Sequence, residues 1–256
     1  MIGEPSAIGI DIGSRTVKLV VWREGPAETA LADAGPEPLA AARRLLEGHS
    51  ARHICATGYG RHLAKEYFAD SAVTEIMAAA LGARYLLPDC RSILDVGGQD
   101  SKAMALDEQG RVVHFEMNDR CAAGTGRFLE VMAERLGYSL EDFAAAAGAQ
   151  RETVRINSLC TVFAESEVVS LMARGERVEL IARGLHEAVT DRLAAMVRRV
   201  SARPPLLFCG GVARNAAVVE VLAAKLGLAV VVPEQPQLVP AIGAALVGKE
   251  RGARRR

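Results

Sequence analysis

The stretch IGIDIGSRTVKLVVW at Ile8–Trp22 decides the fold, because ILDVGGQDSKAMAL at Ile93–Leu106 repeats its outline. Each copy is an apolar run, an Asp-x-Gly turn with polar residues and a second apolar run, which predicts a β-hairpin. One Asp-x-Gly turn is common in proteins, but two copies that place Asp11 and Asp95 alike indicate an internal duplication. We therefore expect two similar lobes whose glycine turns face each other across a cleft.

Both turns have the composition of a phosphate site. Glycine lets the backbone bend tightly and bring its N–H groups close to anionic oxygens. A carboxylate at the end of a strand, as at Asp11 and Asp95, can hold Mg²⁺ directly or through water. The two hairpins together predict a site for one phosphorylated ligand.

A third element, LLFCGGVARNAAVVEVL at Leu206–Leu222, is predicted to be a buried strand, a glycine turn and a helix with Asn215 near its start. A helix N-terminus after paired glycines suits an adenosine or phosphate group. Near the end of the chain, PAIGAALVG at Pro240–Gly248 predicts a small-residue helix on which another element can pack closely.

The order of these elements resembles that of the acetate kinase, sugar kinase, Hsp70 and actin superfamily. The resemblance implies an α/β fold of duplicated ribonuclease H-like lobes with a nucleotide cleft between them. We expect the first lobe at residues 1–87 and the second at 88–256, with the final helix, at about 238–249, packing back on the first lobe.

Composition limits the possible partners and location. The chain has 31 basic and 31 acidic residues and no obvious basic face apart from its last residues, so nucleic acid is not the expected partner. Neither a signal peptide nor a long apolar span is evident, which predicts a cytoplasmic protein that does not bind a membrane. Five cysteines without a secretion signal favour reduced thiols over a disulfide framework.

Two cysteines stand just before predicted helices: Cys121 in NDRCAAGTGRFLEVMAERLG and Cys160 in NSLCTVFAESEVVSLMARG. A helix N-terminus favours the thiolate, which is both the ligand form for iron and a reactive nucleophile. A single cysteine at such a place is more often a small buried apolar residue. Two thiolates cannot complete a four-thiolate site, but a symmetric dimer could supply four.

The two helices that follow should begin at polar caps and bury an apolar stripe. Thr125 is the predicted cap of the first helix, and Ser158 or Thr161 that of the second. The residues expected to face inward are Phe128, Leu129, Met132 and Leu136 in the first helix, and Val162, Val168, Val169 and Met172 in the second. Cys55 and Cys209 are interpreted as core residues and Cys90 as a bystander in a turn, and the histidines show no metal-binding spacing.

Six segments now make the resemblance specific: IDIGSRTVK, ATGYGR, LDVGGQDSK, MNDRCAAGTGRFL, CTVFAESEV and GGVARN. They resemble, in order and over nearly the whole chain, the activator ATPases (component A) of 2-hydroxyacyl-CoA dehydratases and the ATP-binding subunits of benzoyl-CoA reductase. The resemblance implies an ATPase that passes a low-potential electron to a dehydratase or related reductase. It also implies a homodimer that shares one [4Fe-4S] cluster through Cys121 and Cys160 of each subunit, and a ferredoxin or flavodoxin as donor.

The resemblance further implies a role for each motif residue. Phosphate and Mg²⁺ are expected to meet Asp11, Gly13, Ser14 and Arg15 in the first hairpin, and Asp95, Gly97, Gly98 and Gln99 in the second. The nucleoside is expected at Gly210, Gly211 and Asn215. Gln99 is the best candidate for orienting the attacking water, and because glutamine is no strong base it agrees with slow, switch-like hydrolysis.

Two other functions compete with this one. A small-molecule kinase of the same superfamily would need only the hairpins but leaves the two cysteines unexplained, and a chaperone-like module would need a peptide-binding domain. The chain also departs from the family pattern, with Ala79 where a histidine is expected and Leu238 and Pro240 in place of an aromatic residue and a glycine. These departures leave the subfamily, and so the partner, open.

Overall fold

The computed structural model describes residues 5–158 and 160–254, and its contacts divide them into two compact units. Unit 1 comprises Met1–Cys90, Leu106–Val112 and Pro233–Arg256, and unit 2 comprises Arg91–Ala105 and Val113–Val232. The sequence predicted lobes at 1–87 and 88–256 with the final helix packing back on the first, and unit 1 contains that C-terminal segment together with Leu106–Val112.

Unit 1 is built on a five-stranded sheet of order β3-β2-β1-β4-β5. Its strands are β1 (Ala7–Ile12), β2 (Thr16–Trp22), β3 (Pro26–Asp33), β4 (Ile54–Thr57) and β5 (Ser71–Ala72). Its helices are α1 (Pro38–Leu46), α2 (Arg61–Tyr67), α3 (Glu75–Leu86), the short 3₁₀ helix η2 (Pro236–Leu238) and α9 (Val239–Arg254).

Unit 2 has a second five-stranded sheet, of order β10-β9-β6-β7-β8. Its strands are β6 (Ser92–Val96), β7 (Ser101–Leu106), β8 (Val112–Asn118), β9 (Leu206–Cys209) and β10 (Val230–Val231). Its helices are α4 (Gly126–Leu136), α5 (Leu140–Gly148), α6 (Thr161–Ala173), α7 (Val178–Arg199), the 3₁₀ helix η1 (Gly211–Arg214) and α8 (Ala216–Leu226).

The two sheets have the same topology. In unit 1, β1 is antiparallel to β2 and parallel to β4; in unit 2, β6 is antiparallel to β7 and parallel to β9. Even the register agrees, because Asp11 pairs with Lys18 and Asp95 with Lys102. The predicted α/β fold with duplicated lobes is therefore confirmed.

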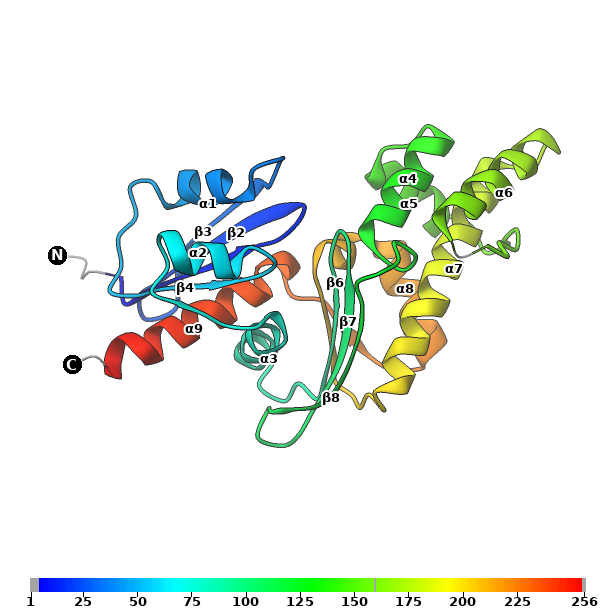
Figure 1. The fold of residues 1–256 in the computed structure, drawn as a ribbon. Coiled ribbons are helices and arrows are strands. Elements are labelled where there is room, and N and C mark those ends of the chain that lie inside the picture. Colours follow the sequence, from blue (N-terminus) through cyan, green and yellow to red (C-terminus); the bar gives the residue numbers. More distant parts are fainter. Residues whose placement is uncertain (1–4, 159, 255–256) are drawn as a thin grey trace. The chain divides into compact units, whose positions relative to one another are not determined.

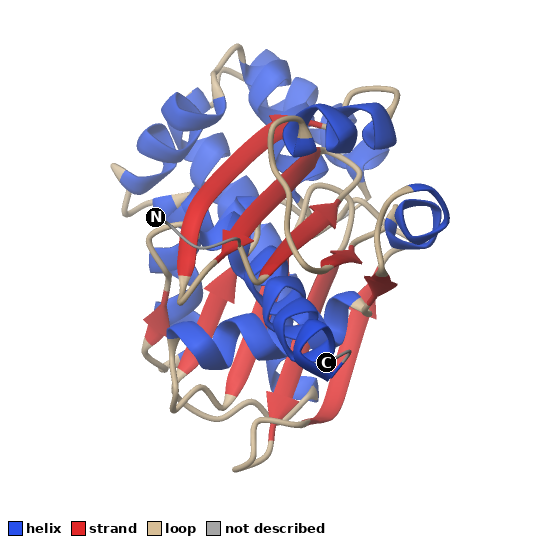
Figure 2. Ribbon diagram, turned by 90° about the vertical axis from the view of Figure 1, so that its left-hand side faces the viewer, coloured by secondary structure: helices blue, strands red, loops and turns tan. Residues whose placement is uncertain are grey.

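Helices cover both faces of the unit 1 sheet (Figures 1 and 2). On one face, Ile8, Ile10 and Leu19 pack with buried alanines of α1 and α2. On the other face, Trp22 and its neighbours pack with Ala241 and other small residues of α9, drawn red in Figure 1. Leu238 belongs to this second cluster.

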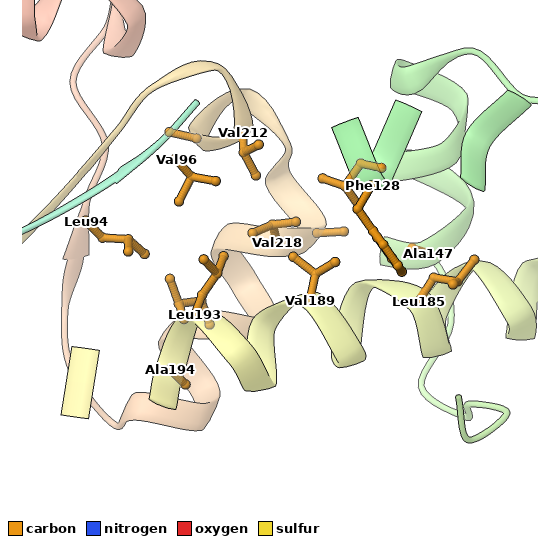
Figure 3. Close-up of a cluster of buried hydrophobic side chains, with 14 of the residues drawn as sticks. Leu94, Val96, Phe128, Ala147, Leu185, Val189, Leu193, Ala194, Val212 and Val218 are labelled. Carbon is orange, nitrogen blue, oxygen red and sulfur yellow. The ribbon is translucent and has the colours of Figure 1, made fainter. Parts of the chain in front are cut away.

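In unit 2 the helices α4, α5, α7 and α8 share one apolar core with the sheet. Figure 3 shows Val189 and Leu193 of α7 close to Val218 of α8, with Leu94 and Val96 of β6 in the same cluster. This core fixes α7 against the strand that carries Asp95.

Within residues 5–158 and 160–254, none of the helices combines the length and the apolar character that crossing a membrane requires.

Candidate nucleotide site and cysteine loops

In unit 1, the predicted phosphate residues lie at the β1–β2 turn. Asp11, near the end of β1, is almost fully buried, and Lys18 Nζ donates a hydrogen bond to its Oδ2 at 2.9 Å. Gly13, Ser14 and Arg15 form the turn itself, which is closed by a bond from Gly13 N–H to the Thr16 carbonyl at 3.1 Å. The hairpin thus combines a glycine turn with a carboxylate and an ammonium group.

The segment ATGYGR runs from the end of β4 to the start of α2, and its Gly58 packs directly against Asp11. Gly58 has φ +87°, and a Cβ there would lie 2.5 Å from both Asp11 Oδ1 and the Ile12 carbonyl oxygen. Thr57 pairs with Asp11 in the sheet register, and its hydroxyl is buried without a hydrogen-bond partner among the described residues. A buried unsatisfied hydroxyl costs about 1–3 kcal/mol, so Thr57 is a candidate ligand contact that the sequence analysis missed.

Unit 2 repeats this arrangement at the β6–β7 turn. Asp95 is again nearly buried. A Cβ on Gly210, at φ +86°, would lie 2.7 Å from Asp95 Oδ1 and 2.3 Å from the Val96 carbonyl oxygen. Gly97 N–H bonds to the Asp100 carbonyl at 2.9 Å, and Gln99 is exposed in the turn. Gly58 and Gly210 are therefore equivalent, although only Gly210 was assigned a role from the sequence.

The two lysines opposite the aspartates were also missed. Lys102 is buried and donates to Asp100 Oδ2 at 2.6 Å, whereas Lys18 donates to Asp11. The signal was present, because both copies of the repeat carry a lysine at the same position after the Asp-x-Gly turn.

Asn215, the predicted nucleoside residue, caps α8 rather than lying within it. Its Oδ1 accepts a hydrogen bond from Val218 N–H at 3.0 Å. Gly210 and Gly211 do not lead straight into this helix, because the 3₁₀ turn η1 intervenes. The Nδ2 of Asn215 lies 3.0 Å from Nε2 of His186 on α7. Burial lowers the pKa of His186 to about 4, so its ring is neutral near pH 7.

The loop that carries Cys121 is held by side chains of the two strands β7 and β8. Asn118 Nδ2 donates to the carbonyls of Cys121 and Ala123 at 2.9 and 3.0 Å. Ser101 of β7 donates to the Gly124 carbonyl at 2.5 Å. Cys121 is half-buried in this loop.

The start of α4 connects this loop to the β6–β7 turn. The N–H groups of Gly126 and Arg127 donate to the carbonyls of Gly97 and Gly98 at 2.9 and 2.8 Å. A displacement of the turn therefore acts directly on the first residues of α4. Thr125 occupies the predicted N-cap position, but its hydroxyl donates to the Ala122 carbonyl and gives no cap bond. The predicted apolar stripe of α4 is confirmed, with Leu136 only partly buried.

Cys160 itself is the N-cap residue of α6, so the caps predicted at Ser158 or Thr161 were wrong. The preceding residues are held by Glu167, which accepts hydrogen bonds from the N–H groups of Asn157 and Ser158. Desolvation raises the pKa of Glu167, but these backbone hydrogen bonds outweigh it and the net pKa is lowered.

The inward face of α6 also differs from the prediction. Val168 is buried together with Ala164 and Leu171, whereas Val162 is 68% exposed and Val169 39% exposed. Met172 is 40% exposed and the neighbouring Phe163 67%. The reason is that Ala164, Val168 and Leu171 recur at helical spacing, which turns the other apolar side chains outward.

The remaining cysteines have no comparable setting. Cys55 and Cys209 are buried, as predicted, and Cys90 is buried as well. Burial raises the pKa of the Cys55 thiol. Among the described residues, no three His, Cys, Asp or Glu side chains gather in a way that could hold a metal ion. Of the two cysteines that stand before helices, Cys121 is half-buried and Cys160 is exposed.

The chain belongs to the BadF/BadG/BcrA/BcrD ATPase family, whose sequence model matches residues 8–248. It is 39% identical over 253 residues to the activator of lactoyl-CoA dehydratase of Anaerotignum propionicum, which covers 95% of this chain and 97% of the relative. The family predicted from the six motif segments is thus confirmed.

Solved structures with a similar fold include two dehydratase activators. Component A of the (R)-2-hydroxyglutaryl-CoA dehydratase of Acidaminococcus fermentans has a TM-score of 0.91 at 33% identity, covering 98% of this chain and 100% of that one. The ADPNP-bound activator of the 2-hydroxyisocaproyl-CoA dehydratase from Clostridium difficile has a TM-score of 0.89 at 34% identity, covering 97% and 96%. A ROK family glucokinase from Streptomyces griseus shares the fold alone, with a TM-score of 0.60 at 14% identity, covering 95% and 99%.

Proposed function

We propose that this protein is an ATP-hydrolysing iron–sulfur activator that passes a low-potential electron to a 2-hydroxyacyl-CoA dehydratase or a related reductase. Relatives of the chain include the activators of 2-hydroxyisocaproyl-CoA dehydratase and lactoyl-CoA dehydratase, and the first of these was solved with bound ADPNP. The observation that carries the proposal is the pair of hydrogen bonds from the start of α4 to Gly97 and Gly98, because it joins a phosphate turn to a cysteine loop.

In this proposal the glycine turns bind the phosphates of ATP. Asp11 and Asp95 hold Mg²⁺ directly or through water, and Gly13, Ser14, Arg15, Gly97 and Gly98 contact phosphate oxygens. Gln99, exposed in its turn, orients the attacking water. Gly210, Gly211 and Asn215 hold the nucleoside.

Cys121 and Cys160 are the ligands we propose for a [4Fe-4S] cluster shared by a homodimer. Both thiols precede helices and neither is fully buried, which suits ligands that a second subunit must complete. When bound, the cluster would supply a one-electron carrier. The exposed Val162 and Phe163 beside Cys160 support an interface there, because apolar side chains gain from being covered.

Coupling would run through the chain's own hydrogen bonds. A change in phosphate contacts at Gly97 and Gly98 shifts the carbonyls that receive the first N–H groups of α4, and the loop with Cys121 ends at this helix. A ferredoxin or flavodoxin is the proposed donor, and the protein acts in the cytoplasm.

The first test is optical. Protein purified without oxygen should be brown, with about four irons per dimer. Cys121→Ser and Cys160→Ser should lose the colour and the iron, whereas Cys55→Ala, which changes a buried thiol of unit 1, should keep both. Colourless, iron-free wild-type protein would overturn the proposal. A small-molecule kinase of the same superfamily would then be the next function to test.

A further inference from the structure

The amide of Asn215 is held at both ends by atoms of unit 2. Oδ1 accepts a hydrogen bond from Val218 N–H, and Nδ2 faces His186 Nε2. Asn215 is half-buried, so part of the amide stays accessible. An amide group has two N–H hydrogens and two lone pairs, which leaves one hydrogen and one lone pair for a ligand.

The tautomer of His186 follows from its other contact. Nδ1 lies 2.8 Å from the Ala182 carbonyl oxygen. A carbonyl can only accept, so Nδ1 carries the hydrogen and Nε2 of the neutral ring is an acceptor. The Asn215 atom that faces Nε2 must then be the NH₂ group, and the two residues determine each other's orientation.

His186 has little freedom to turn away. It is fully buried on α7, its ring centroid lies 4.5 Å from that of Phe143 on α5, and the Thr190 hydroxyl donates to its carbonyl at 2.9 Å. Its neighbours Leu185 and Val189 belong to the apolar core shown in Figure 3. The ring is a rigid acceptor placed behind Asn215.

We propose that His186 is a positioning residue for nucleotide binding, because its Nε2 fixes the amide of Asn215 in the one orientation that presents an N–H and a lone pair to the nucleoside. Such a pair suits a ribose hydroxyl, which donates and accepts, or the edge of a purine. The inference rests on the proposed function and adds a residue that has no role in the sequence motifs.

The test separates the nucleoside from the phosphates. Binding of ATP and of tripolyphosphate is measured by calorimetry for wild-type, His186→Leu, His186→Gln and Val197→Ala protein. Tripolyphosphate carries the phosphates without the nucleoside, so only ATP depends on Asn215. Val197→Ala disturbs the same core about three turns of α7 away from His186 and leaves both hydrogen bonds of the histidine ring in place.

His186→Leu should raise the Kd for ATP about tenfold, the size of one lost hydrogen bond, and leave the Kd for tripolyphosphate unchanged. His186→Gln, which can still offer an acceptor, should recover most of the affinity, and Val197→Ala should bind both ligands as the wild type does. His186→Met replaces His186→Leu if the latter does not fold.

Two results would overturn the inference alone: normal ATP affinity in folded His186→Leu protein, or an equal loss for ATP and tripolyphosphate. Wild-type protein that binds no ATP would overturn the proposed function together with the inference.

Discussion

The β1–β2 turn of unit 1 and the β6–β7 turn of unit 2 are copies with different connections. Both place an aspartate opposite a lysine and beside a glycine of positive φ. In unit 1, Lys18 donates a hydrogen bond to Asp11, and in unit 2, Lys102 donates one to Asp100 within the turn. Among the hydrogen bonds of the described residues, only those of the second turn link it to a helix that follows a cysteine. Its Gly97 and Gly98 carbonyls accept from the first N–H groups of α4, which comes after Cys121.

The difference arises in the segments between the strands. Between β3 and β4, unit 1 has the single helix α1, whereas between β8 and β9 unit 2 has α4 to α7 and both candidate cluster cysteines. The duplicated sheet contains the same turn twice. The longer segment of unit 2 adds the helix α4, whose first N–H groups are hydrogen-bonded to the β6–β7 turn.

The largest effect on stability is expected at Gly58 and Gly210, the equivalent glycines that pack against the two aspartates. Gly58→Ala and Gly210→Ala should each lower the free energy of unfolding by about 3–4 kcal/mol, because Cβ would meet a backbone carbonyl and φ is left-handed. Urea denaturation measures this. Gly35→Ala in unit 1 and Gly227→Ala in unit 2 are matched controls with positive φ and open space, and should cost about 1 kcal/mol. A Gly210→Ala variant no worse than Gly227→Ala would show that the tight contact is absent.

His186 sharpens the comparison, because it lies on α7 in the segment that distinguishes unit 2. Burial lowers its pKa from the ordinary 6.5 of histidine to about 4 in the folded protein, so the unfolded chain binds the proton first as the pH falls. Stability from this group is complete above pH 6.5 and declines by about 3 kcal/mol down to pH 4. Between pH 7 and pH 5, urea midpoints of His186→Leu should fall less than those of the wild type. Equal slopes would contradict the buried neutral ring.

Ser101 tests the link between sheet and cysteine loop. Its counterpart in the first copy of the repeat is Val17, which has no hydroxyl. Ser101→Ala removes the donor to the Gly124 carbonyl and should cost about 1–2 kcal/mol. In iron-free protein, alkylation of Cys121 should become faster by about thirtyfold at most, while alkylation of Cys160 should not change. Ser170→Ala, an exposed hydroxyl on α6, is the control, and faster alkylation of Cys160 alone would argue against a local effect.

The smallest effect is expected at the surface. Arg199 forms two hydrogen bonds with Glu116 of β8, but its side chain is 59% exposed. Glu116→Gln should change stability by less than about 1 kcal/mol and progressively less as salt is added. The looser pair of Arg23 and Glu28 in unit 1, at 3.7 Å, should give still less. A salt-independent loss at Glu116 would indicate a packing role instead.

Several parts of the molecule could be predicted from sequence because their signals are local. The repeated Asp-x-Gly turns gave both hairpins, and the spacing of Phe128, Leu129 and Met132 gave the buried face of α4. The buried face of α6 could not be predicted, because the helix carries apolar side chains on several of its sides. Several faces were therefore equally plausible before the neighbouring helices were known.

The sequence by itself determined the duplicated α/β fold, the family and the two thiols that stand before helices, since each depends on residues that are close together along the chain. Only the tertiary structure decided that Gly58 matches Gly210, that Glu167 holds the residues before Cys160 and that His186 faces Asn215. These contacts join residues that are distant in sequence, and their partners are selected by packing and by the need to satisfy buried polar groups, which no local pattern records.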